Sequence, residues 1–305
     1  MVLEPDTVCE ARLVPLLYHE DFSAGLAGWT VVDAGTNAAP SAWAPVGHPV
    51  LSGDGATTAG TVVTLTGAGD LSVLDPASDV VLLATDILRP SKSYRVLSVD
   101  NATKQVTLDA APMLFWGVSA WEVPASRGVV QTSNIWGGSD TAADPAKPGT
   151  MLVGGDAGWT DYRVTVLLHS SDDDAVGVVF RYLDAANHYR YSMDAERGYR
   201  RLVRVSGGAY TVLAEDDFRY QPDQDYEVTA EAVGARIRVY QDGALVFEVT
   251  DGTFSHGRIG LYCWANTGAH FADVRVDDLG AAAPVAYRFS FTTSRYAGFY
   301  DHLHS

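Results

Sequence analysis

The stretch that decides the fold is DYRVTVLLHSSDDDAVGVVFRYLDAANHYRYSMD, residues 161–194. Three runs in it, at 161–168, 175–182 and 187–193, are rich in β-branched and aromatic residues. Clusters of Ser, Asp, Ala and Asn separate the runs and supply turn residues. The alternation of short apolar runs with turn clusters is typical of consecutive β-strands, so we predict strands here.

The same pattern continues through most of the chain. Short runs such as TVVTLT, DVVLLAT, YEVTAEA and RIGLYCW recur between Gly, Asp and Asn turns. VYQDGALVF, residues 239–247, predicts a hairpin around Asp242–Gly243, the dipeptide that favours a type I′ turn. No amphipathic pattern extends beyond a turn or two of helix. Regularly spaced short strands predict a β-sandwich or a barrel.

Composition excludes several classes of protein. The chain has 305 residues, is 47% hydrophobic and 19% charged, and so can bury a sizeable core. Its net charge of −17 would repel phosphate backbones, so we expect no nucleic-acid partner. No apolar run approaches the roughly 18–20 residues of a membrane span, so we expect no membrane insertion. The two cysteines, Cys9 and Cys263, exclude a disulfide framework.

Both ends of the sequence indicate a piece of a larger protein. The N-terminal MVLEPDTVCEARLVPLLYHEDF lacks the basic region and apolar stretch of a signal peptide. The C-terminal FSFTTSRYAGFYDHLHS stops in aromatic-rich material that a free tail would expose. We therefore expect an excised part of an extracellular or particle-associated protein.

The tripeptide SAW occurs twice, at 41–43 and at 119–121, and about five strand-like runs lie between the copies. This spacing predicts a small β-barrel planted in a loop of a sandwich, because insertions are tolerated at exposed loop tips. The predicted units are an N-terminal extension (1–17), the sandwich (18–43 plus 119–279), the inserted barrel (44–118), and a linker with the start of a next region (280–305). One larger sandwich with a coincidental repeat is the alternative.

Several segments resemble the concanavalin A-like lectin/glucanase superfamily. They are EDFSAGLAGW at 20–29, GVVQTSNI at 128–135, SSDDDAVGVVFRYLDAANHYRYSMD at 170–194 and GRIGLYCWANTGAHFADVRV at 257–276. The stretch around DDDAVGVVFRY is similar to laminin-G modules and to the lectin-like C-terminal domain of thrombospondins. The resemblance implies an antiparallel jelly-roll β-sandwich, a fold that hosts lectins, hydrolases and adhesion modules alike.

Hydrolases of this superfamily carry alternating acids on one strand, which places an attacking and a proton-donating carboxylate on one face. The nearest match here is Glu215–Asp217, with no Glu at the required offset. No other motif for nucleophilic, metal or phosphate chemistry is present. We therefore predict that the chain is not an enzyme, and an enzyme that acts on glycans ranks last among the alternatives.

Strand alternation places a group of basic residues on one outer face. If residues 175–182, 187–193 and 200–205 are neighbouring strands, their basic side chains gather on the side away from the core. The predicted set is Arg181, His188, Arg190, Arg200 and Arg204. Guanidinium groups on such a face would bind carboxylate, sulfate or sugar hydroxyls. The alternative is a solvated face balanced by nearby acids, or a charged edge that resists pairing.

The same reasoning in RIGLYCWAN puts Cys263 in the core as a buried thiol and Tyr262, Trp264 and Asn266 outside. An outward aromatic pair beside an amide is typical of a platform for a sugar ring. The alternative is an aromatic residue that a loop or the inserted barrel covers.

The superfamily resemblance also implies a structural calcium. It would be held by an acid before the Phe of the first strand and by another in the last strand, which here are Asp21 and Asp273, with Glu20 as a substitute. A second acidic cluster, Asp172–Asp174, is interpreted as turn chemistry.

These observations predict an all-β fold: an antiparallel jelly-roll β-sandwich with a small β-barrel inserted in an N-terminal loop. The predicted function is non-catalytic, lectin-like binding of a carbohydrate or another surface ligand. The alternative is a structural module that packs against other subunits of an assembly, such as an adhesin or a phage-tail-like particle, with no small ligand.

Overall fold

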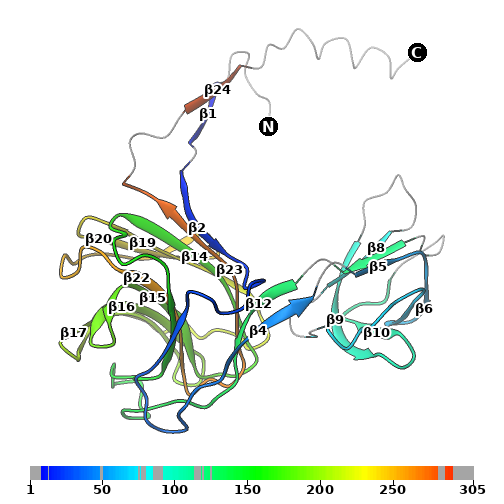
Figure 1. Ribbon diagram of the computed structural model, residues 1–305, viewed down its shortest axis with the longest axis horizontal. Coiled ribbons are helices and arrows are strands. Elements are labelled where there is room, and N and C mark those ends of the chain that lie inside the picture. The colour runs from blue at the N-terminus through cyan, green and yellow to red at the C-terminus, as the bar shows by residue number, and fades with distance from the viewer. Residues whose placement is uncertain are drawn as a thin grey trace.

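The computed structural model describes residues 8–12, 14–48, 51–74, 76, 80–84, 92–112, 118, 120–123, 126–280 and 286–290. The regular elements in these ranges are all strands, which confirms the all-β prediction. Within the same ranges no helix is long and apolar enough to cross a membrane. Two antiparallel sheets pack face to face as a jelly-roll sandwich, and a smaller sheet stands beside them (Figure 1).

One layer of the sandwich is a seven-stranded sheet, in the order β18-β17-β16-β15-β22-β13-β3. Its strands are β3 (Thr30–Asp33), β13 (Thr150–Gly154), β15 (Ala175–Asp184), β16 (Asn187–Asp194), β17 (Tyr199–Ser206), β18 (Ala209–Asp216) and β22 (Arg258–Trp264). Strands β15 to β18 follow one another both in sequence and in space, as the short turns between them predict.

The other layer is an eight-stranded sheet, in the order β21-β20-β19-β14-β23-β12-β4, with β2 also paired to β23. Its strands are β2 (Leu16–Glu20), β4 (Trp43–His48), β12 (Ser126–Gln131), β14 (Tyr162–Ser170), β19 (Tyr226–Val233), β20 (Arg236–Gln241), β21 (Ala244–Thr250) and β23 (Ala269–Asp278). The predicted hairpin is confirmed: Gln241 pairs with Ala244, and Asp242 and Gly243 both have positive φ, as a type I′ turn requires.

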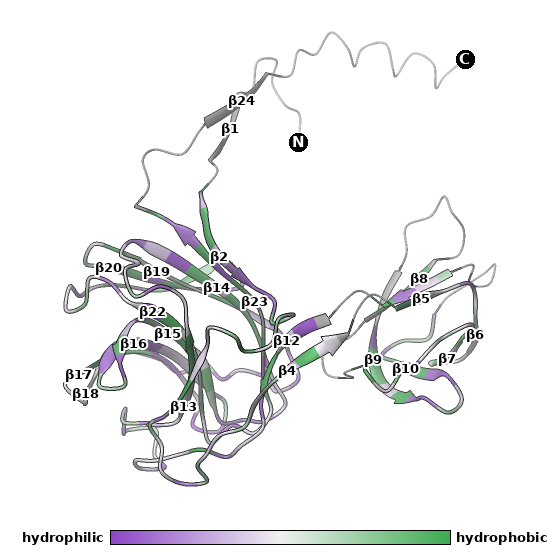
Figure 2. Cartoon of the chain, viewed as in Figure 1, coloured by the Kyte–Doolittle hydropathy of each residue, from purple (hydrophilic) through white to green (hydrophobic). Residues whose placement is uncertain are grey.

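The main core lies between the two sheets. Val166 of β14, Val178 of β15 and Leu261 of β22 are fully buried there, and hydrophobic residues run along β15 and β22 in Figure 2. Cys263 belongs to this core as a free, buried thiol, as predicted. Tyr191 also faces inward, so alternation correctly assigns the core face of β15, β16 and β22.

The seven-stranded sheet is apolar on its outer face as well. A second buried cluster there contains Met151, Val153, Val179 and Tyr262. A sheet covered on both faces loses the simple alternation of apolar and polar residues. For this reason the outer face of this sheet is not the open polar surface that the sequence predicts.

Between β4 and β12 the chain forms a separate seven-stranded sheet, in the order β5-β11-β8-β9-β10-β7-β6. Its strands are β5 (Leu51–Gly53), β6 (Ala56–Ala59), β7 (Val62–Leu65), β8 (Val80–Ala84), β9 (Lys92–Asp100), β10 (Gln105–Leu108) and β11 (Ala120–Val123). A bridge between Ala56 of β6 and Val118, two residues before β11, brings the β6 end of the sheet back toward its other side. The sheet encloses its own buried cluster, which includes Val63, Val96 and Trp121.

The smaller sheet leaves the sandwich through one strand pair. β4 and β12 are antiparallel partners, Trp43 opposite Gln131 and His48 opposite Ser126, and they lead toward the smaller sheet (Figure 1). The second SAW copy ends at Trp121 in the core of the smaller sheet, so the two copies do not flank a split sandwich strand. The division into a host sandwich and an inserted barrel stays a prediction, and the predicted barrel, 44–118, is shifted from strands β5–β11 by a few residues.

The two ends of the described chain meet in a two-stranded ribbon. β1 (Val8–Arg12) pairs with β24 (Ala286–Ser290), and Cys9 lies opposite Phe289 in the register. The ribbon projects from the edge of the sandwich beyond β2 and β23 (Figure 1). The C-terminal residues after 290 lie outside the described residues.

Candidate ligand-binding pocket

Arg181 does not lie on an open face, so its predicted exposure is wrong. Its φ of 45° marks a bulge in β15, where the pairing with β16 and β22 shifts register. The bulge breaks the alternation and sends the side chain inside, where it is 0% exposed. There its guanidinium donates to the carbonyls of Gly234 (2.7 Å), Phe254 (2.8 Å) and Thr160 (3.0 Å). Arg181 therefore ties both sheets together and offers no surface to a ligand.

His188 and Arg190 lie on the predicted side of β16, but both are buried. Arg190 is covered by the main chain of residues 145–147: it donates to the carbonyls of Lys147 and Pro145, both at 2.9 Å. Burial, together with the nearby charge of Arg190, lowers the pKa of His188 to about 4. His188 is therefore neutral at pH 7, and the predicted open basic face is covered.

Arg200 and Arg204 do not share a face with Arg190, which corrects the prediction for β17. Val203, not Arg204, stands opposite Arg190 in the register of β16 and β17. Leu202 consequently faces the main core. Arg200 and Arg204 lie on the same face of β17 as Leu202, at the rim of the core. Each forms an ion pair there: Arg200 with Asp216 at 2.9 Å and Arg204 with Asp251 at 2.6 Å.

Trp264, Tyr262 and Asn266 are also buried, so the alternative reading of a covered aromatic holds for this part of the site. The covering segment is residues 134–148. The indole Nε1 of Trp264 donates to the Gly137 carbonyl (2.8 Å), and the Tyr262 hydroxyl donates to the Lys147 carbonyl (2.6 Å). Two cations lie over the Trp264 ring, Lys147 at 4.4 Å and Arg197 at 4.5 Å from the centroid. With its ring occupied, Trp264 is not free to stack on a sugar.

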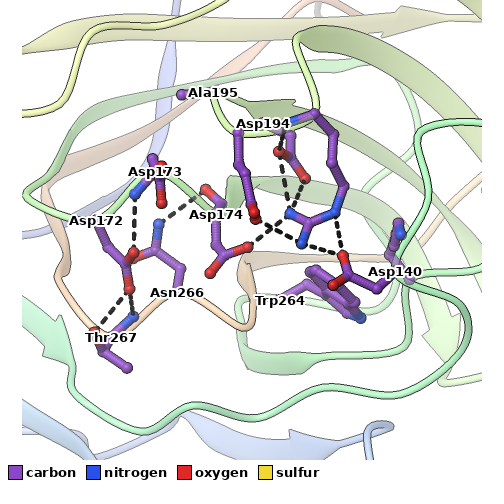
Figure 3. A network of polar contacts seen from close by, with 12 residues as sticks. Asp140, Asp172, Asp173, Asp174, Asp194, Ala195, Trp264, Asn266 and Thr267 are labelled. Atoms are coloured by element: carbon purple, nitrogen blue, oxygen red, sulfur yellow. Dashed lines mark hydrogen bonds and ion pairs between the residues drawn. The ribbon is translucent and has the colours of Figure 1, made fainter.

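Asn266 has a structural contact set. Its amide nitrogen donates to the Ser170 hydroxyl (2.8 Å) and to the Asp174 carbonyl (2.9 Å). These bonds fasten the end of β22 to the hairpin between β14 and β15 (Figure 3). Asn266 therefore positions the acidic turn 172–174 and does not itself contact a ligand.

A small pocket opens beside the buried Trp264. It has a volume of about 200 Å³. It is lined by Asn134, Trp136, Asp140, Asp174, Glu196, Arg197, Trp264 and Ala265. Trp136 is 38% exposed and meets Trp264 edge-on, with 6.4 Å between ring centroids. The pocket therefore combines an accessible aromatic ring with carboxylates and a guanidinium.

Arg197 is the centre of the polar groups in this pocket. Its guanidinium contacts Asp174 (2.7 Å), Asp194 (3.1 Å) and Glu196 (2.8 Å), and it also pairs with Asp140. Figure 3 shows the carboxylates of Asp140, Asp174 and Asp194 converging on it from three segments of the chain. Burial would lower the pKa of Arg197, but its bonds to Asp174 and Asp140 outweigh burial and raise the pKa. The guanidinium is thus a permanent cation among four acids.

Asp174 is the titratable group of the pocket. Burial raises the pKa of Asp174 to about 6, although its bond to Arg197 acts in the opposite direction. The carboxylates of Asp172, Asp173 and Asp174 lie close together. Asp172 accepts from the amide (2.6 Å) and hydroxyl (2.7 Å) of Thr267. The cluster is thus occupied by turn and ion-pair contacts, as its interpretation as a turn predicts.

Asp21 and Asp273 each contact a basic side chain. Asp21 contacts Arg127 at 3.1 Å, and Asp273 contacts His19 at 2.7 Å. Glu20, the predicted substitute, accepts from the Phe22 amide (2.7 Å) and from the Trp29 indole (3.1 Å). A calcium ion needs six to eight oxygens that converge on one point. In the structure these two carboxylates are already engaged by Arg127 and His19.

The sequence reasoning did not single out Trp136, Asp140 or Arg197. Trp136 and Asp140 come from an irregular segment, so alternation gives them no face, and Arg197 lies in the turn between β16 and β17. The available signal was compositional: IWGGSDTAADPAKPG places a Trp and two acids in a loop of small residues. Polar and aromatic residues in a loop are disproportionately functional.

No family model matches the chain. A levanase from Bacillus subtilis (strain 168) is 25% identical over 191 residues, which are 60% of this chain and 28% of the levanase. The chain thus corresponds to less than a third of that relative. The solved carbohydrate-binding module CBM66 from Bacillus subtilis is 26% identical, covering 47% of this chain and 91% of the module with a TM-score of 0.40.

A second solved structure is a Bacillus subtilis protein of unknown function with a galectin-like fold. The match covers 89% of this chain and 98% of that protein, with 9% identity and a TM-score of 0.41. The jelly-roll sandwich itself agrees with the architecture that the superfamily resemblance implies. The narrower likeness to laminin-G and thrombospondin modules stays a prediction.

Proposed function

We propose that the chain is a non-catalytic carbohydrate-binding domain, and that the pocket beside Trp136 holds one sugar unit. The accessible indole supplies a face for the C–H bonds of a sugar ring, and the surrounding carboxylates and Arg197 supply partners for its hydroxyls. The volume of about 200 Å³ is below the ~300–1,000 Å³ of ordinary ligand pockets, so a single ring fits better than a chain.

The charge of the pocket favours a neutral sugar. Four carboxylates surround the Arg197 guanidinium, and Lys147 over the Trp264 ring is a second cation, so the site still carries an excess of negative charge. A carboxylate or sulfate on the ligand would be repelled, whereas hydroxyl groups can donate to the acids. The similarity to a levanase supports a fructan such as levan as the first ligand to test.

The direct test is substitution of the open tryptophan. Trp136→Ala should weaken binding of levan fragments by at least about tenfold, or ~1.4 kcal/mol, because the stacking face is lost. Isothermal titration with levan-derived saccharides measures the change. Leu167→Ala is the matched control, since Leu167 is a similarly exposed apolar residue on the eight-stranded sheet.

Equal affinities of the wild type and Trp136→Ala for every saccharide that binds would contradict the proposal. If a glycan array shows no binding by the folded wild type, the alternative function gains support: a structural module of a multi-subunit assembly. Release of reducing sugar from levan by the purified chain would contradict the non-catalytic assignment.

An extracellular or particle-associated location follows from the proposed function and stays a prediction. The calcium proposal for Asp21 and Asp273 also stays a prediction, although a bound ion would have to displace Arg127 and His19. Calcium titration of the wild type and Asp273→Asn tests it: equal melting temperatures with and without calcium would exclude a structural ion.

A further inference from the structure

Two arginines are buried on the outer face of the seven-stranded sheet of the sandwich. They lie next to the pocket but are not among the residues that line it. Arg190 of β16 and Arg201 of β17 are each 1% exposed. The irregular segment 139–148, which we name the strap, covers both, and its Asp140 also lines the pocket. The strap supplies no carboxylate to either arginine in the described part of the chain. Arg201 has one acidic partner, Glu215 of β18, at 3.4 Å, and Arg190 has no carboxylate within 4 Å among the described residues.

The strap holds these arginines through main-chain carbonyls. Arg190 donates to the carbonyls of Lys147 and Pro145, and Arg201 donates to those of Ala142 (2.8 Å) and Asp144 (3.4 Å). A carbonyl is a neutral acceptor. Hydrogen bonds from a guanidinium to an oxyanion are about twice as strong as neutral ones and are often bidentate.

Further polar atoms under the strap have no partner. Arg190 Nε and Ser192 Oγ are buried and make no hydrogen bond within the described residues. Ser192 shares the outer face with Arg190 and stands opposite Arg201 in the register. Buried polar groups are ordinarily satisfied, and leaving one unpaired costs about 1–3 kcal/mol. The three residues therefore present donors to an acceptor that the strap does not supply.

We propose that this face is a second binding site, for the carboxylate or sulfate group of an anionic sugar, and that the ligand displaces the strap to reach it. Arg190 and Arg201 bind the oxyanion, and Ser192 donates a further hydrogen bond. The rings of Tyr262 (4.6 Å from the Arg190 guanidinium) and Tyr210 (5.6 Å) pack against Arg190 and hold its guanidinium in place. This site goes beyond the pocket at Trp136, whose acids favour a neutral ring.

The strap is irregular, and polar bonds rather than apolar packing hold it to the sheet. It belongs to no strand, residues 139–143 are exposed, and glycines 137, 138 and 149 flank it. Its shape depends on Asp144, whose carboxylate accepts from the amides of Ser139 (3.1 Å) and Ala146 (2.9 Å). Segments with few apolar contacts open at low free-energy cost. Loss of the Asp144 carboxylate should therefore release the strap and leave the sheet intact.

The test uses the full chain with Trp136→Ala, so that the neutral-sugar pocket does not contribute. Glucuronate, glucose 6-sulfate, glucose and sodium sulfate are titrated calorimetrically, with and without Asp144→Ala. We expect saturable binding of glucuronate or glucose 6-sulfate but not glucose, about tenfold tighter with Asp144→Ala because less free energy is needed to open the strap. Whichever of the two anionic sugars binds with the lower Kd shows whether the site prefers a carboxylate or a sulfate.

Two further measurements keep the result interpretable. Arg190→Gln should abolish the binding of the anionic sugar. If circular dichroism shows that this variant is unfolded, Arg201→Gln is used in its place. Hydrogen exchange at residues 141–147 should speed up with glucuronate and not with glucose. Absence of saturable binding to the Asp144→Ala protein, or unchanged exchange in the strap, would overturn the proposal.

Sodium sulfate binding as tightly as the sugars would mean an adventitious ion only and would also overturn it. Because the pocket is disabled in this background, neither failure bears on the binding proposed at Trp136.

Discussion

At the scale of residues, the chemistry of the pocket depends on one carboxyl group. Asp174 is held between Arg197, which favours its ionised form, and burial, which favours its neutral form and raises its pKa to about 6. Because its pKa when unfolded is near 3.8, the folded chain binds this proton more tightly than the unfolded chain does. Stability contributed by Asp174 is therefore greatest at low pH and declines as the pH rises from about 4 to about 6.

The raised pKa of Asp174 gives a prediction for the Asp174→Asn variant. The free energy of unfolding of the wild type should fall relative to that of the variant between pH 4 and pH 6.5, because the variant has no proton to lose. Denaturant unfolding of both proteins across this range measures the difference. Asp173→Asn, at the exposed neighbouring position, is the control and should follow the wild type. A constant difference between Asp174→Asn and wild type at all pH values would contradict the account.

Single residues also mark where sequence reasoning stops. Alternation assigns Val178 and Tyr191 to the core correctly, because both strands are regular at those positions. It fails at Arg181, where the bulge reverses the side that the residue faces. A bulge depends on pairing with two neighbouring strands, and a single sequence does not reveal that pairing.

At the scale of elements, strand register decides which residues meet. For β17 the sequence offers two faces, and the pattern of valines favours the wrong one. The register with β16 sets Val203 opposite Arg190, so Leu202 faces the core. The strap then covers the outer face, which no periodicity in GGSDTAADPAKPG indicates. The sheet was therefore predictable, whereas its covered face and the pocket beside it were not.

The contact of β15 with β16 makes a prediction at this scale. A Cβ at Gly177 would lie 2.0 Å from the carbonyl oxygen of Tyr191 and 2.8 Å from the Cα of Ser192. Because both atoms belong to the backbone of the paired strand, Gly177→Ala should destabilise the sandwich by about 2 kcal/mol or more. Chemical unfolding measures this. Gly252→Ala, whose Cβ would meet only the Ala235 methyl at 3.4 Å, is the control. Equal stabilities of the two variants would disprove this packing.

At the scale of the whole molecule, two separate cores suggest two cooperative units. The cluster around Val63, Val96 and Trp121 shares no residue with the cluster between the sandwich sheets. The resemblance to lectin-like domains and the run of short strands predicted strands in both regions, and the division of the chain into domains stays a prediction. The SAW repeat did not mark a split strand of the sandwich, because Trp121, the last residue of its second copy, packs inside the smaller sheet.

Trp121→Ala tests this division. The variant should lose about 3–5 kcal/mol from the smaller unit only, since a large buried side chain is removed from its core. Calorimetry should show two transitions in the wild type and a downward shift of one of them in the variant. A single transition that shifts as a whole would mean that residues 51–123 and the sandwich unfold as one domain.

The central claim is that a sugar binds at Trp136. The chain has seven tryptophans, and each gives one indole N–H signal in a ¹⁵N correlation spectrum. Titration with a short levan-derived saccharide should shift the Trp136 signal most and that of Trp264 less, and it should leave the signal of Trp121, which lies in the core of the smaller sheet, in place. A saturable titration that moves other indole signals and leaves Trp136 unchanged would contradict the account.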